Sequence, residues 1–172
     1  MRDDLILVDE EDCEVGFCDK VACHVGKGKL HRAFSIFIFN SRNELLIQKR
    51  AEGKMLWGGF WSNSCCSHPR RGESLENAAA RRIVEELGIA CGLRRVYKFL
   101  YSAEFGNEGS EREVCSVFVG RCDDEPVLNF DEVEEFRWVD VEELLREVLV
   151  SPELYTPWFK MELAELRRRK EL

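Results

Sequence analysis

The strongest pattern along the chain is a run of large apolar residues between positions 30 and 40. In LHRAFSIFIFN the odd positions 33–39 face one way and the even positions 34–38 the other, and both sets are mostly apolar. Because side chains alternate between the two faces of a strand, this predicts a long central strand covered on both faces. The polar turn NSRN and the segment ELLIQKR then predict an antiparallel return strand.

Further strands follow from the same kind of pattern. Residues 4–8 and 14–18 predict a hairpin around an acidic turn, and three more strands are predicted at residues 94–105, 111–122 and 134–140. Between them the segment MLWGGFWSNSCCSHP is rich in aromatic, glycine and small polar residues. This composition predicts a loop, and so apolar a loop is typical of a functional site.

A helix is predicted from Ser74, a suitable N-cap, to Gly88, a suitable C-terminal stop. Spacings of three and four place Arg82 and Glu86 side by side on this helix, partly inward beside apolar neighbours. A charge on an inward face is costly unless it is paired, so we expect partners for both.

Two further helices are predicted at residues 141–149 and 156–170, where Pro157 suits the first turn. The chain has no internal repeat, no low-complexity tract and no linker that divides it. We therefore expect a single α+β domain over residues 1–172, in which helices pack outside a largely antiparallel mixed sheet.

Composition and charge limit the classes of function that this chain can have. A net charge of −8 without a dominant basic tract argues against nucleic-acid binding. Basic residues nevertheless cluster in two segments, 49–54 and 70–82, which suits a small anionic substrate. No signal sequence and no run of membrane-spanning length is visible, so we expect a cytoplasmic protein. The eight cysteines match no CxxC pattern and are expected to be reduced thiols, most of them packed in the core.

The chain has only three histidines, and all lie in polar neighbourhoods: His24, His31 and His68. Glu111 and Glu113 lie one strand repeat apart, so they point the same way. Imidazole and carboxylate both suit a borderline divalent metal. A lone histidine is more often an ordinary core or surface residue, but together these five residues indicate one metal site gathered from three parts of the chain.

The predicted helix also carries the outline of a Nudix box. The outline comprises Ser67, Glu73, Arg81, Arg82, Ile83, Glu85, Glu86 and Gly88. Two positions depart from the motif, because Ser67 stands for its opening glycine and Arg82 for a glutamate. On the helix alone, an exposed face with ordinary i,i+4 ion pairs explains the pattern equally well.

The surrounding motifs resolve this ambiguity. WSNSCCSHP before the box, the His24 and His31 pair, and EREVC after it together resemble type 1 isopentenyl-diphosphate isomerases, a family with a Nudix-like fold. The resemblance covers nearly the whole chain, from about Leu5 to the C-terminal helix. It implies isomerisation of isopentenyl diphosphate to dimethylallyl diphosphate, for isoprenoid synthesis.

The resemblance also implies roles for individual residues. The first metal, manganese, magnesium or zinc, falls on His24, His31, His68, Glu111 and Glu113. The acid/base pair falls on Cys66 and Glu113, with Tyr101 hydrogen-bonding near it. Trp158 falls where an aromatic lid would cover the hydrocarbon and stabilise a cationic intermediate. Trp57 and Trp61 are further candidates for the pocket wall.

For the diphosphate, the resemblance implies contacts from Lys20, Arg50, Lys54 and Arg82. A second ion, magnesium, would be held by Glu86 and the backbone carbonyl of Cys66. An arginine at position 82 can donate two hydrogen bonds to phosphate oxygens, whereas a glutamate there would repel them. We expect a small isoprenyl diphosphate as the substrate, and a monomer or weak dimer as the oligomeric state.

Two other functions are weighed against this one. A Nudix hydrolase cleaving a diphosphate would need a glutamate-rich helix, and Arg82 counts against it. A non-catalytic metal- or diphosphate-binding protein would need no proton shuttle, and the retained Cys66 and Glu113 count against that.

Overall fold

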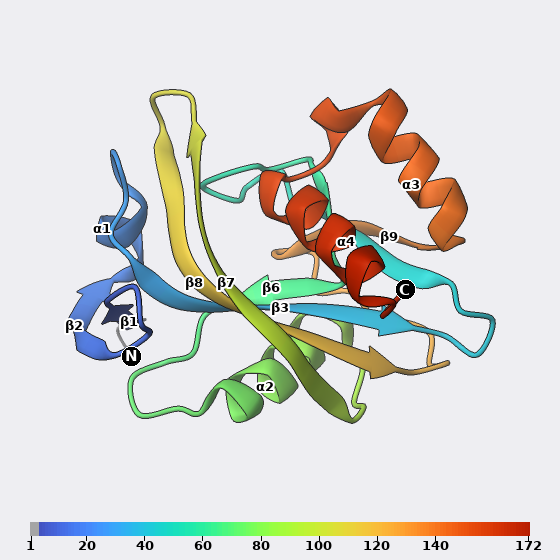
Figure 1. The fold of residues 1–172 in the computed structure, drawn as a ribbon, viewed down its shortest axis with the longest axis horizontal. Helices are drawn as coiled ribbons and strands as arrows, with labels where there is room; N and C mark the ends of the chain where they lie inside the picture. The colour runs from blue at the N-terminus through green and yellow to red at the C-terminus, as the bar shows by residue number, and fades with distance from the viewer. Residues whose placement is uncertain (1–3) are drawn as a thin grey trace.

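The computed structural model describes residues 4–172, and one continuous sheet joins its nine strands (Figure 1). The expected domain of residues 1–172 includes residues 1–3, which lie outside the described part. In chain order the elements are β1 (Asp4–Val8), β2 (Glu14–Asp19), α1 (Lys20–His24), β3 (His31–Phe39), β4 (Leu45–Arg50), β5 (Trp61–Ser62), β6 (Cys65–Ser67), α2 (Leu75–Leu87), β7 (Leu93–Phe105), β8 (Gly109–Arg121), β9 (Val133–Val139), α3 (Val141–Val150), a 3-10 turn η1 (Pro152–Leu154) and α4 (Pro157–Arg169).

Strand β3 is the centre of the sheet, as the apolar alternation predicts. It pairs in parallel with β8 along its whole length, from His31 opposite Glu113 to Phe39 opposite Arg121. Its other edge pairs antiparallel with β1, β6 and β4 in turn. Every other strand pair is antiparallel as well. The prediction of an α+β fold with a largely antiparallel mixed sheet is confirmed.

Helices cover both faces of this sheet (Figure 1). On one face, Phe34, Ile36 and Ile38 of β3 pack with buried residues of α2. On the other, Phe37 and Phe39 pack with α3 and with buried residues of α4. The two-sided burial of β3 therefore separates two apolar cores. None of the helices within residues 4–172 combines the length and hydropathy that a bilayer span requires.

Helix α2 begins and ends as predicted. The Ser74 side chain accepts a hydrogen bond from the backbone N–H of Asn77, and Gly88 ends the helix in the left-handed region at φ 66°. Its N–H donates to the carbonyl of Val84. A glycine meets this backbone conformation without the steric penalty that a Cβ would bring.

Three short elements differ from the prediction: β5, β6 and α1. The segment read as a loop contains β5 and β6, and Cys66 in β6 pairs opposite Ser35 of β3. The turn-like composition of this segment does not predict strands. Each of the two forms because it pairs with a longer neighbouring strand, β5 with β4 and β6 with β3. Helix α1 is also unexpected; the side chain of Asp19 caps it by accepting hydrogen bonds from the N–H groups of Val21 and Ala22.

Candidate active site

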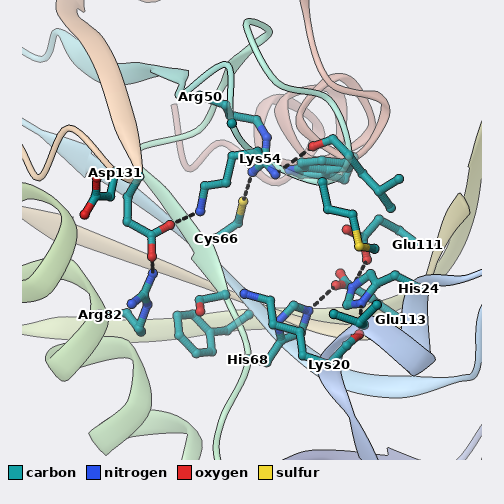
Figure 2. Close-up of a pocket in the computed structure, with 18 of the residues that line it drawn as sticks. Lys20, His24, Arg50, Lys54, Cys66, His68, Arg82, Glu111, Glu113 and Asp131 are labelled. Atoms are coloured by element: carbon teal, nitrogen blue, oxygen red, sulfur yellow. Dashed lines mark hydrogen bonds and ion pairs between the residues drawn. The ribbon is translucent and has the colours of Figure 1, made fainter. Parts of the chain in front are cut away.

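The candidate site is a cavity of about 290 Å³ at one end of the sheet (Figure 2). A histidine- and glutamate-rich wall lies on one side and a cationic wall on the other, with Cys66 between them. The lining comes from widely separated parts of the chain and includes Lys20, His24, Arg50, Lys54, Cys66, His68, Arg82, Tyr101, Glu111, Glu113, Asp131, Glu132 and Trp158.

The three histidines and two glutamates converge on one point. One candidate ligand atom from each residue lies within 4.8 Å of all the others: His24, His31, His68, Glu111 and Glu113. The parallel register explains much of this, since His31 at the start of β3 lies opposite Glu113 of β8. Helix α1 brings His24, and the chain leaving β6 brings His68.

Backbone hydrogen bonds fix the orientation of two of these rings. The Nδ1 of His24 lies 2.6 Å from the carbonyl of Lys20, and the Nδ1 of His31 lies 2.7 Å from the carbonyl of Lys29. A carbonyl only accepts, so in each neutral ring Nδ1 carries the proton and Nε2 presents a lone pair. This is the arrangement in which a metal-binding imidazole is held from behind.

Those lone pairs face carboxylate oxygens. The Nε2 of His24 lies 2.9 Å from Glu111, and the Nε2 atoms of His31 and His68 lie 3.4 Å and 2.9 Å from Glu113. The buried Nε2 of His31 and Oε2 of Glu111 have no hydrogen bond of good geometry. Acceptors that face acceptors need a positive charge between them, and five N and O donors fit a divalent cation.

The protonation of the group follows from burial and from its own charges. Burial opposes protonation of His24, but its contact with Glu111 outweighs this and raises its pKa. Burial and the neighbouring imidazoles of His31 and His24 lower the pKa of His68 well below the usual value. Although burial disfavours the charged form of Glu113, its contact with His31 and the hydrogen bond from Tyr101 lower its pKa, so it is a carboxylate at neutral pH.

Cys65 and Cys66 point to opposite faces of β6, as expected for neighbours in a strand. Cys65 is fully buried in the core beneath α2, whereas Cys66 reaches the cavity. Burial raises the pKa of Cys66 to about 12, so at neutral pH it is a thiol. The Nη1 of Arg50 lies 3.5 Å from its sulfur, and two backbone carbonyls hold the rest of that guanidinium.

Tyr101 and Trp158 complete the apolar end of the cavity. The hydroxyl of Tyr101 donates to Glu113 Oε2 at 2.7 Å. The indole N–H of Trp158 donates to the hydroxyl of Ser62 at 3.1 Å, and its ring stands edge-on to Trp57, with 5.1 Å between ring centroids. Trp57 thus braces Trp158 instead of lining the cavity. Trp61 is not part of the wall either; its ring lies under the guanidinium of Arg137.

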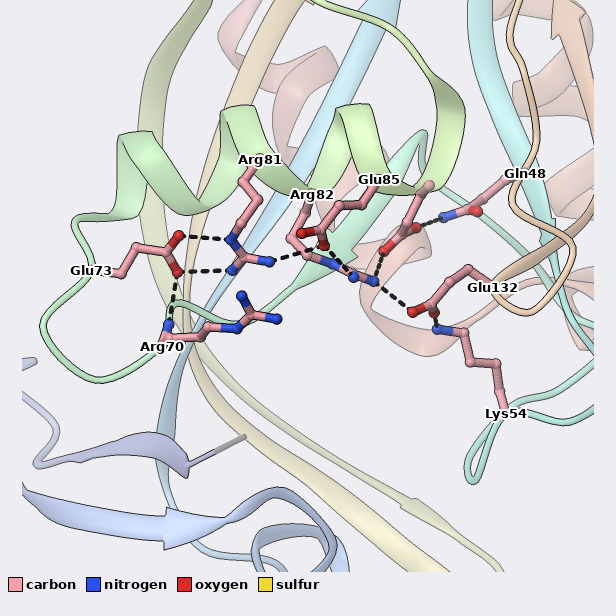
Figure 3. Close-up of polar contacts among 9 residues, drawn as sticks. Gln48, Lys54, Arg70, Glu73, Arg81, Arg82, Glu85 and Glu132 are labelled. Carbon is pink, nitrogen blue, oxygen red and sulfur yellow. Dashed lines mark hydrogen bonds and ion pairs between the residues drawn. The ribbon is translucent and has the colours of Figure 1, made fainter. Parts of the chain in front are cut away.

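The cationic wall carries a residue that the sequence did not single out. Glu132 accepts a hydrogen bond from Arg82 at 2.9 Å and also pairs with Lys54 (Figure 3). Burial lowers the pKa of Lys54 to about 8. Asp131, the preceding residue, also lines the cavity (Figure 2). Both belong to the acidic segment FDEVEEF, which is indistinguishable in sequence from a solvated surface.

Arg82 is the centre of the polar network on α2. Its guanidinium contacts Glu85 at 2.7 Å and Glu86 at 2.6 Å, and these contacts raise its pKa despite burial (Figure 3). Glu86 is almost fully buried and also accepts from Gln48 at 3.3 Å. It lies behind Arg82 and is not among the residues that line the cavity. The partners expected for this inward-facing pair are therefore present.

Known proteins resemble this chain in sequence and in fold. Residues 29–159 match the NUDIX domain family. The chain is 49% identical to "Isopentenyl-diphosphate Delta-isomerase 2" of Aromatoleum aromaticum, over 92% of this chain and 83% of the relative. It is 48% identical to "Isopentenyl-diphosphate Delta-isomerase 2" of Photorhabdus laumondii, over 93% and 90% of the two chains. The crystal structure of DR0079 from Deinococcus radiodurans superposes with a TM-score of 0.76 and 25% identity, covering 96% of this chain and 98% of that one.

Proposed function

The chain belongs to the isopentenyl-diphosphate Delta-isomerase family and carries a NUDIX domain, and from this premise we propose that it converts isopentenyl diphosphate to dimethylallyl diphosphate. The observation that carries the proposal is one cavity lined by both Cys66 and Glu113, with an aromatic end and a cationic wall. Each part of the cavity matches one requirement of this reaction.

The reaction moves a double bond by one carbon. A proton is added to the terminal methylene carbon, and another is removed from the allylic carbon nearer the diphosphate, so the substrate and product have the same atoms. An alkene is a very weak base, so the acid must be held against it in a pocket that excludes water. Cys66 as a thiol and Glu113 as a carboxylate supply one donor and one acceptor in a single cavity. Because the isomerisation is reversible, each must be able to give and to take a proton.

The aromatic end suits the charge that develops between these two transfers. Protonation leaves a tertiary cationic centre, which a nucleophile would trap and an aromatic face stabilises without bonding. The buried ring of Trp158, fixed by Ser62 and Trp57, provides such a face. The hydroxyl of Tyr101 holds the carboxylate of Glu113 in position from the other side.

The cationic wall suits the diphosphate. We assign Lys20, Arg50, Lys54 and Arg82 to it, since all four line the cavity. Bidentate contacts from arginine and point charges from lysine are the usual way to bind phosphate oxygens. The assignment of Glu86 and the Cys66 carbonyl to a magnesium ion that accompanies the diphosphate rests on the family resemblance.

A divalent metal, manganese, magnesium or zinc, would be held by His24, His31, His68, Glu111 and Glu113. When bound, it supplies positive charge that sets the proton affinity of Glu113 and neutralises the facing acceptors. Apart from the ion, the hydroxyl of Tyr101 holds the Glu113 carboxylate in place by donating to it at 2.7 Å.

Hydrolysis of a diphosphate is the less favoured function. A Nudix hydrolase holds metal ions on the glutamates of its motif helix, but here Glu85 is paired with both Arg81 and Arg82, and Glu86 is paired with Arg82 (Figure 3). The arginines thus neutralise much of the negative charge on this helix, which weakens the magnesium-rich arrangement that hydrolysis would require.

Incubating the purified protein with isopentenyl diphosphate and magnesium separates the candidate functions. We expect dimethylallyl diphosphate, detected by NMR, and no release of phosphate. Free phosphate would instead support a hydrolase, and recovery of unchanged substrate would support a protein that only binds.

A further inference from the structure

Glu162 of α4 is an unexpected residue in the core. It lies one helical turn after Trp158 and is fully buried within residues 4–172, with 0% exposure. Its helix neighbours Phe159, Leu163 and Leu166 belong to the apolar core on that side of the sheet. One carboxyl oxygen, Oε2, is buried without a hydrogen-bond partner. An apolar residue of the same size would be expected at such a position on stability grounds.

The other carboxyl oxygen ends a row of polar side chains that leads back to the cavity. The thiol of Cys115 on β8 lies 3.7 Å from Glu162 Oε1, and the hydroxyl of Ser35 on β3 lies 3.5 Å from the same thiol. Ser35 also interacts with the Glu162 carboxyl group and favours its charged form. In the sheet, Ser35 is directly opposite Cys66 of β6, and directly opposite residues present their side chains on the same face.

This row therefore connects the elements that carry the reacting groups. Cys66 lies on β6, next to Ser35, while Cys115 lies two residues after Glu113 on the same face of β8. Glu162 and Trp158 share one face of α4, since they are four residues apart. A single carboxyl group in the core thus touches β3 and β8 and belongs to the helix that bears Trp158.

Burial raises the pKa of Glu162 to about 8, so at neutral pH it is mostly a neutral carboxylic acid. In that form it can both donate and accept hydrogen bonds. Two titratable groups besides Cys115 interact electrostatically with it. The charge of Glu113 on β8 raises the pKa of Glu162, and Glu162 in turn raises the pKa of Tyr97 on β7. A neutral acid can stay in this core without a counter-ion, which an ionised one could not do cheaply.

We propose that Glu162 is a positioning residue for the isomerisation, which holds Cys66 and Trp158 in register with Glu113 through Ser35 and Cys115. The inference rests on the proposed function, because it concerns the geometry of that same reaction. Local rules of stability are typically broken where function needs a particular arrangement, and a buried polar group retained in an apolar core is such a case.

Two substitutions test this proposal. Glu162→Met keeps the volume but removes the polar group, so we expect a higher melting temperature together with a kcat about tenfold lower, because the reacting groups lose their alignment. KM should stay within about twofold, because the row does not touch the cationic wall. Glu162→Gln can still donate and accept, so it should restore kcat to near the wild-type value. Leu163→Met, a volume-conserving change at the next position on α4, is the matched control and should leave kcat unchanged.

A purely structural role for Glu162 would make kcat follow stability in these variants. Wild-type kcat in Glu162→Met would overturn the inference, and so would a Gln variant as slow as the Met variant. If Glu162→Met does not fold, Cys115→Ala breaks the same row at its middle and should show the same loss of kcat. Failure of the wild-type protein to isomerise the substrate would overturn the proposed function instead, which keeps the two outcomes distinct.

Discussion

Cys65 and Cys66 illustrate how much depends on which face of a strand a residue occupies. Both are cysteines in one short strand, but Cys65 is packed beneath α2 while Cys66 reaches the cavity beside Arg50. The alternation of a strand predicts that only one of them faces a given side, and the family motif selects Cys66. The sequence could not show that the surroundings of Cys66 keep it a thiol, because that depends on burial by distant segments.

We therefore expect Cys66→Ala and Glu113→Gln each to abolish isomerisation without unfolding the protein. The reaction loses one of its two proton-transferring groups in each case, which costs at least about two orders of magnitude in rate. Turnover by NMR, with a melting curve for each variant, measures this. Cys65→Ala is the matched control and should remain active; an active Cys66→Ala enzyme would show that another group transfers the proton.

Glu132 neutralises Arg82 and Lys54, two of the four cations to which we assign the diphosphate. A diphosphate must displace or outcompete this carboxylate at Arg82 and Lys54. We expect Glu132→Gln to bind inorganic diphosphate more tightly, by about threefold to tenfold, which corresponds to about 1 kcal/mol. Calorimetric titration tests this. Glu134→Gln, which breaks an exposed pair with Lys49 at 2.9 Å, is the control; equal affinities in both variants would contradict the competition.

Among the helices and strands, the long periodic ones follow from the sequence and the short ones do not. The pattern of residues 30–40 predicts β3, and caps at Ser74 and Gly88 predict α2, because local chemistry dictates both. Strand β6 has only three residues and exists because it pairs with β3. Helix α1, which carries His24, has five residues and depends on the Asp19 cap and on packing. Such elements are specified by their tertiary context, which a sequence pattern does not contain.

The buried Glu162 of α4 makes the free energy of unfolding depend on pH. The folded-state pKa of Glu162 is about 8 against an ordinary value of 4.5, so the folded protein keeps a proton there that the unfolded chain releases. The unfolded state thus binds fewer protons between these two values, and the free energy of unfolding falls as pH rises from about 4.5 to about 8, by up to about 5 kcal/mol.

We expect Glu162→Gln to remove this dependence. The gain in melting temperature of the variant over the wild type should be small near pH 4.5 and largest above pH 8. Differential scanning calorimetry across this range measures it. A gain that does not change with pH would show that the Glu162 carboxyl group does not titrate in this range.

Across the whole molecule, the group of three histidines and two glutamates joins residues from distant parts of the chain. His24 is on α1, His31 begins β3, and His68 follows β6. The sequence predicts that these residues form one site, because three imidazoles and two carboxylates are a suitable set of ligands for one divalent ion. It did not predict the parallel pairing of β3 with β8, which is what aligns His31 with Glu113.

Treatment with a chelator should therefore loosen the N-terminal segment. Without a cation the lone pairs of His24 and His31 face carboxylates directly, so we expect chelation to lower the melting temperature and to increase hydrogen exchange between residues 19 and 31. Exchange in α3, which is remote from the group, serves as the internal control. A melting curve that is indifferent to the chelator would contradict this coupling.

In the proposed reaction the double bond shifts because one proton is added and another is removed, through groups that exchange with water. Turnover of isopentenyl diphosphate in D₂O, followed by NMR of the product, tests this mechanism. We predict dimethylallyl diphosphate with deuterium in one of its methyl groups, because the acid delivers a solvent-derived proton to the terminal carbon. A product without deuterium at that methyl group would contradict the mechanism.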